Sequence, residues 1–173
     1  MQRLFKLIGI TLFVTACSSG VETRIHSSGT GPLSAQTYHI AMAEGASADV
    51  RRAYVLVQDA LSAQGFAPAD DAAILLQITV DSRDAALALG TTGPQNLSAA
   101  KGRKPLQNCA DKEFRLGLTM TRIADGAEIY RSRVAEYHCK MPLSDAMPSM
   151  VDAAVADLGK PRGSYLIRRN AVE

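Results

Sequence analysis

The sequence predicts an α+β fold, a two-layer sandwich in which two helices pack on one face of a mainly antiparallel sheet. Two segments show the three- and four-residue apolar spacing of amphipathic helices, and others place apolar side chains at every second position, as half-buried strands do. Asp125-Gly126 is a strong hairpin signal between two such strands. Helices interspersed with an antiparallel meander give the expected order β-α-β-β-β-α, with an optional last strand.

The first strand and helix are expected early in the chain. Residues 37–43 have the composition of a short strand, and Ser47 is placed to N-cap the helix that follows. Gly65 and Pro68 are expected to end that helix. Its apolar stripe comprises Val50, Ala53, Tyr54, Val57, Ala60 and Leu61.

The next strand is expected over residues 73–82. Its inward positions are Ile74, Leu76, Ile78 and Val80, which alternate with Gln77, Thr79 and Asp81. Leu75 interrupts the polar side, which favours a central strand with both faces partly covered. From 86 to 107 the pattern is lost, and a loop this long is either functional or disordered.

The hairpin strands are expected over residues 112–123 and 127–139. A two-residue turn would place Leu118 opposite Arg133, whereas a three-residue loop with Gly126 in the left-handed conformation would place Leu118 opposite Val134. We favour the second register because it buries the apolar face better.

A second helix is expected near the C-terminus. Its stripe comprises Met147, Val151, Ala154 and Leu158. Pro148 suits a first turn, Gly159 is expected to cap the helix, and Pro161 prevents its continuation. Residues 164–168 are the optional last strand.

The N-terminus has the pattern of a secretory signal peptide. Arg3 and Lys6 precede a ten-residue apolar run, which is too short to span a membrane. Removing residues 1–16 leaves 17 basic and 17 acidic residues, a neutral chain that lacks the basic footprint of a nucleic-acid binder. Residues 18–35 are rich in Ser, Gly and Thr and are expected to be a flexible tether, so 36–173 would form a single periplasmic domain.

Val14-Thr15-Ala16-Cys17 resembles the lipobox of bacterial lipoproteins. The resemblance implies cleavage before Cys17, a lipid on the thiol of Cys17, and a membrane anchor. Ser18 stands where Asp would favour the inner membrane, so the resemblance points to the outer membrane, facing the periplasm.

If Cys17 carries lipid, Cys109 and Cys139 remain as an even pair in an oxidising compartment, and we expect a disulfide between them. The alternative is a metal or thiol site that includes His138. Neighbouring strand residues point to opposite faces, so His138 and Cys139 are poorly placed to share an ion.

The lipobox and the order of elements resemble small envelope lipoproteins of Gram-negative bacteria. These include domain-of-unknown-function families, auxiliary lipoproteins of lipid-transport systems and the lipoprotein subunit of lipopolysaccharide assembly. The sequence has no G-x-S-x-G elbow, H-E-x-x-H, P-loop or G-x-G-x-x-G motif. His26, His39 and His138 show no metal-binding spacing, and we expect no metal or cofactor.

Lys101, Arg103 and Lys104 form the one concentrated charge feature of the mature chain and are the candidate anion-binding residues. They would suit phosphates of lipopolysaccharide or carboxylates of peptidoglycan, on a mobile loop dispensable for folding. The expected function is therefore a non-enzymatic lipoprotein that binds or supports another envelope component. The alternatives are a periplasmic enzyme acting on cell-wall material and a carrier of a lipid or other hydrophobic ligand.

Overall fold

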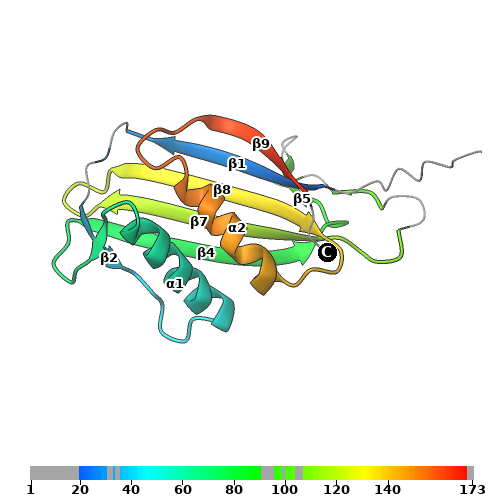
Figure 1. Cartoon of the computed structure of the whole chain (residues 1–173), viewed down its shortest axis with the longest axis horizontal. Coiled ribbons are helices and arrows are strands. Elements are labelled where there is room, and N and C mark those ends of the chain that lie inside the picture. The colour runs from blue at the N-terminus through cyan, green and yellow to red at the C-terminus, as the bar shows by residue number, and fades with distance from the viewer. Residues whose placement is uncertain are drawn as a thin grey trace, which may run out of the picture.

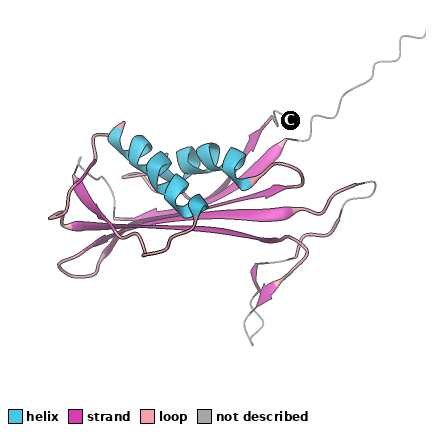
Figure 2. Ribbon diagram, turned by 90° about the horizontal axis from the view of Figure 1, so that it is seen from below, coloured by secondary structure: helices cyan, strands magenta, loops and turns pink. Residues whose placement is uncertain are grey.

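The computed structural model describes residues 20–30, 33, 36–90, 96–98, 100–103 and 107–170, so the predicted signal peptide and Cys17 lie outside the described residues. Two helices cover one face of a large sheet and leave the other face uncovered (Figures 1 and 2). The elements are β1 (Val21–Gly29), β2 (Thr37–Ile40), α1 (Ala48–Ser62), β3 (Ala67–Pro68), β4 (Ile74–Asp84), β5 (Leu89–Gly90), β6 (Asn96–Ser98), β7 (Lys112–Arg122), β8 (Glu128–His138), α2 (Leu143–Val155) and β9 (Gly163–Arg169).

The large sheet has seven strands in the order β3-β2-β4-β7-β8-β1-β9. Its strands pair antiparallel except at one edge, where β2 runs parallel to β3 and to β4. The predicted α+β class is therefore confirmed. The predicted order of elements is incomplete, because it lacks β1 and the short strands β3, β5 and β6.

β1 corrects the expectation that residues 18–35 are wholly a tether. It lies between β8 and β9 and pairs with both along its length (Figure 1). Its inward side chains are Thr23, Ile25 and Ser27, of which only Ile25 is apolar. A strand whose buried positions are mostly polar carries no apolar alternation, which explains why sequence patterning misses it.

α1 confirms the predicted helix closely. The Ser47 side chain accepts a hydrogen bond from the backbone N–H of Val50 at 3.3 Å, and Gly65 adopts φ +85° beyond the helix end. α2 begins earlier than predicted, at Leu143, so Pro148 is an interior residue rather than part of the first turn. Beyond α2, Gly159 has the predicted left-handed conformation.

In the hairpin of β7 and β8, the side chains lie on the predicted faces of the sheet, but the two strands do not pair in the predicted register. Leu118 pairs with Ser132, and Leu116 pairs with Val134. This differs by two residues from the favoured register, and an irregularity between Met120 and Thr121 shifts the pairing by one residue near the turn. A shift of two residues leaves every side chain on its expected face.

The core lies between the helices and the sheet. Its largest fully buried apolar side chains are Tyr38, Leu61, Leu76, Leu118, Met120, Met147 and Met150. The hydroxyl of Tyr130 donates to the carbonyl of Ala154 at 2.7 Å, so β8 and α2 are joined by a buried hydrogen bond as well as by apolar contact. Among the described residues, neither helix is long and apolar enough to cross a membrane.

The predicted disulfide is present between Cys109 and Cys139, whose Cα atoms are 5.6 Å apart. The pairing of Lys112 with His138 at the end of the hairpin brings the two cysteines together, as the sequence predicts. The bond closes the segment that contains both β7 and β8.

Candidate functional site

The helix-free face of the sheet carries the side chains that alternate with the core. Reading the strand registers across the sheet gives a central row of cross-strand neighbours from β4 to β9. This central row consists of Thr79, Gly117, Arg133, His26 and Ser164. The neighbouring row, one step toward the disulfide, consists of Asp81, Arg115, Ala135, Arg24 and Leu166.

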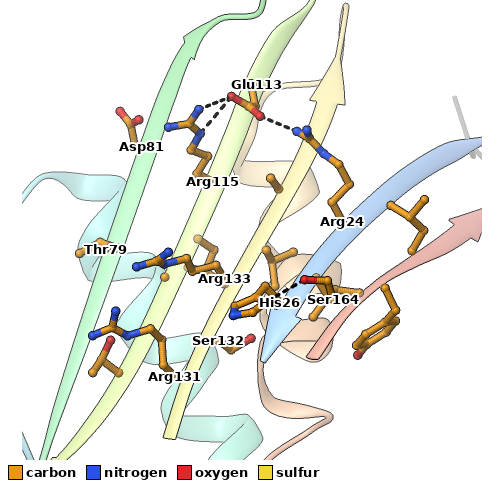
Figure 3. A pocket seen from close by; sticks show the side chains of 18 residues that line it. Arg24, His26, Thr79, Asp81, Glu113, Arg115, Arg131, Ser132, Arg133 and Ser164 are labelled. Carbon is orange, nitrogen blue, oxygen red and sulfur yellow. Dashed lines mark hydrogen bonds and ion pairs between the residues drawn. The ribbon is translucent and has the colours of Figure 1, made fainter. Parts of the chain in front are cut away.

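Both rows line a broad, open groove of about 960 Å³. Figure 3 shows polar side chains from β4, β7, β8, β1 and β9 around it. Small residues make part of its floor, and arginines from three adjacent strands surround it. These arginines are Arg24, Arg115, Arg131 and Arg133.

Glu113 organises one end of the groove. Its carboxylate is buried and accepts hydrogen bonds from Arg24, from Nε of Arg83 at 2.6 Å, and from Nη2 of Arg115 at 2.6 Å. Burial alone would raise the pKa of Glu113, but the hydrogen bonds from these three arginines hold the pKa below its usual range. The cluster fixes three guanidinium groups in place around one carboxylate.

Beyond this cluster, two further arginines line the groove, Arg131 and Arg133. Arg131 pairs with Glu128, while Arg133 is exposed and makes no ion pair among the described residues. Arg131 and Arg133 are two apart on β8, so both point from the same face of the sheet. Only Asp81 and Glu113 supply carboxylates to the groove lining, against four arginines.

Gly117 lies in the centre of the floor, beside the side chain of Thr79. A Cβ added at this position would lie 2.4 Å from the Oγ1 atom of Thr79, so the missing side chain leaves room for the Thr79 hydroxyl. Across the groove, Nδ1 of His26 and Oγ of Ser164 are 2.8 Å apart, which holds the ring at the groove wall (Figure 3).

Lys101 and Arg103, the two described members of the candidate anion-binding set predicted from the sequence, do not line this groove. Nζ of Lys101 lies 2.6 Å from the Asp111 carboxylate and 4.3 Å from the ring centroid of Tyr137, so its charge already has partners. Arg103 is exposed, and Lys104 lies outside the described residues.

The histidines are also dispersed. His26 lies on β1, His39 on β2, and His138 on β8, where its Nε2 is 2.8 Å from the Glu136 carboxylate. Within the described ranges, no cluster of three or more His, Cys, Asp or Glu side chains could hold a metal ion. Asp70 and Asp71 lie in a turn.

Sequence reasoning missed the arginines of the groove, although a signal for part of them was present. Arg131 and Arg133 share one face of a strand that was predicted correctly. Arg24 and His26 share a face in the same way, but they lie on β1, in the segment that the sequence pattern predicts to be a tether. Only the order of strands in the sheet places these two pairs side by side.

Comparison with known proteins gives similarity of fold alone. No protein-family model and no curated protein matches the chain. A PDZ domain protein from Parabacteroides distasonis has a TM-score of 0.59 at 11% identity, over 88% of this chain and 40% of that chain. This chain thus spans less than half of that protein. Two structures of a PelC dodecamer from Paraburkholderia phytofirmans have TM-scores of 0.51 at 13% and 12% identity, each over 81% of this chain and 99% of that chain.

Proposed function

We propose that the protein is a lipid-anchored envelope lipoprotein that acts by binding another envelope component on the helix-free face of its sheet. The observation that carries this proposal is the groove of about 960 Å³ on that face, which is lined by polar and charged side chains from five strands. A concave surface with several convergent polar groups is the usual form of a binding site.

Two further features support binding on this face rather than between the layers. The space between helices and sheet is filled by the core, whose side chains are almost completely buried. The groove instead is open, and Glu113 holds Arg24 and Arg115 while Glu128 holds Arg131, so these three guanidinium groups are positioned before a partner arrives.

The membrane anchor rests on the lipobox at Val14–Cys17. Anchoring would place the groove at the outer membrane, facing the periplasm, and raise its local concentration near envelope partners. Lipopolysaccharide and peptidoglycan are the partner classes that the sequence suggests, and both carry anionic groups that suit an arginine-lined groove.

Co-purification from crosslinked cells tests the proposal. The double variant Arg131→Gln/Arg133→Gln should lose most of the captured envelope component, whereas Arg51→Gln/Arg52→Gln on α1 should retain it. The two variants remove equal charge, so the comparison separates an effect of the groove from an effect of net charge.

Cys17→Ser should move the protein out of the membrane fraction. Equal capture by both double variants would contradict the binding surface, and unchanged fractionation of Cys17→Ser would contradict the anchor.

A further inference from the structure

The groove holds more hydrogen-bond donors than the protein's own acceptors satisfy. Arg133 has no ion-pair partner among the described residues. The buried Nε atoms of Arg24 and Arg131 likewise have no acceptor from the described part of the protein. The guanidinium group of Arg133 is exposed in the groove, so its donors are available to acceptors that a ligand brings.

The central row concentrates this excess at one point. Arg133 is the cross-strand neighbour of Gly117 on one side and of His26 on the other. Directly opposed residues in a sheet have Cβ atoms about 5 Å apart, which is within the reach of a guanidinium group. Arg131 lies two positions along the same strand, about 7 Å away, and pairs with Glu128, which leaves Arg133 as the cation of the central row without an ion-pair partner among the described residues.

The central row offers further polar groups beside Arg133. Gly117 contributes no side chain, and the hydroxyl of Thr79 lies beside it. His26, held by Ser164, lies on the opposite side of Arg133. The groove's one exposed carboxylate, Asp81, is in the neighbouring row rather than in the central row.

We propose that the central row is a subsite for an oxyanion, a phosphate or carboxylate group carried by the ligand, with Arg133 as its main contact. This deepens the proposed function, on which it rests, by naming the chemistry of the ligand. A guanidinium group offers two parallel N–H donors that match two oxygens of a phosphate or a carboxylate. The hydroxyl of Thr79 and the ring of His26 are placed to add hydrogen bonds on either side.

Calorimetric titration of the full-length chain in non-ionic detergent, with inorganic pyrophosphate and separately with citrate, tests the subsite. Wild type and Arg52→Gln, an exposed cation on α1, should bind with equal affinity. Arg133→Gln should bind about ten- to a hundredfold more weakly, since a hydrogen bond to a charged group is lost. Arg133→Lys should be intermediate because it keeps the charge but not the paired donors.

The two probes distinguish the sources of the oxyanion. Tighter pyrophosphate binding would assign the subsite to phosphate groups, and tighter citrate binding to carboxylates. Failure of wild type to bind either probe, or equal affinities for Arg133→Gln and Arg52→Gln, would overturn the subsite.

If co-purification still depends on the groove arginines in that case, the proposed function stands without the oxyanion subsite. If probe binding persists while co-purification does not depend on the groove, the proposed function fails and the anion site remains.

Discussion

Replacing Glu136 with Gln should lower the free energy of unfolding at pH 7 by about 3 kcal/mol, because the change breaks a buried ion-pair network. Glu136 is fully buried and accepts hydrogen bonds from the hydroxyl of Thr23 at 2.6 Å and from Nη2 of Arg169. Its other oxygen lies 2.8 Å from Nε2 of His138. The network therefore joins β1, β8 and β9, and Gln would present an amide donor where the structure requires an acceptor.

The effect should depend on pH with a definite sign. Burial alone would raise the pKa of Glu136, but the hydrogen bonds from His138 and Thr23 and the charge of Arg169 hold the pKa below its ordinary value of 4.5. A carboxylate with a lowered pKa stabilises the folded state above its unfolded pKa, and that stabilisation is lost as the pH falls through the folded pKa. The difference between wild type and Glu136→Gln should thus be full at pH 7 and shrink below about pH 4.5.

Urea unfolding between pH 2 and pH 7 measures this dependence. Glu22→Gln serves as the matched control, since Glu22 is exposed and its carboxylate lies 3.6 Å from Nη2 of Arg168, which is also exposed. Such surface pairs contribute about 0–1 kcal/mol. Equal losses in the two variants at pH 7, or a loss in Glu136→Gln that does not change with pH, would show that the buried network does not hold the three strands together.

Removing the disulfide should have an effect of similar size. The double variant Cys109→Ser/Cys139→Ser should unfold with a free energy lower by about 3.5–4 kcal/mol, because the bond closes a sequence separation of 30 residues in the unfolded chain. Urea unfolding of the variant, of oxidised wild type and of reduced wild type measures the difference. Reduced wild type should match the variant. Two alkylatable thiols in freshly isolated protein would contradict the bond itself.

The elements with apolar periodicity could be predicted from the sequence. α1 and β4 have the expected inward residues because their buried positions are apolar and the opposite positions are polar. β1 could not be predicted in this way, since Thr23 and Ser27 are buried polar residues. Their acceptors are Glu136 and Asp157, more than 100 residues away in the chain. Only the folded sheet shows that these side chains are satisfied.

The candidate site depends on the same missing strand. The sequence pattern places Arg24 and His26 in a tether, where they have no cross-strand neighbours. The groove forms only when β1 pairs with β8 and brings these two residues beside Arg131 and Arg133. Lys101 was instead the visible candidate, because a sequence shows charge but not the partner that neutralises it. The contacts of Lys101 with Asp111 and Tyr137 arise from tertiary packing.

Site-specific photo-crosslinking in cells tests most directly whether the helix-free face is the binding surface. A photoreactive amino acid would replace Thr79, which is exposed in the groove, or Asp152, which is exposed on α2. Position 79 should crosslink to an envelope component, and Arg133→Gln in the same chain should weaken that crosslink, while position 152 should yield none. A partner captured at position 152 and absent at position 79 would place the binding surface on the helices and contradict binding on the helix-free face.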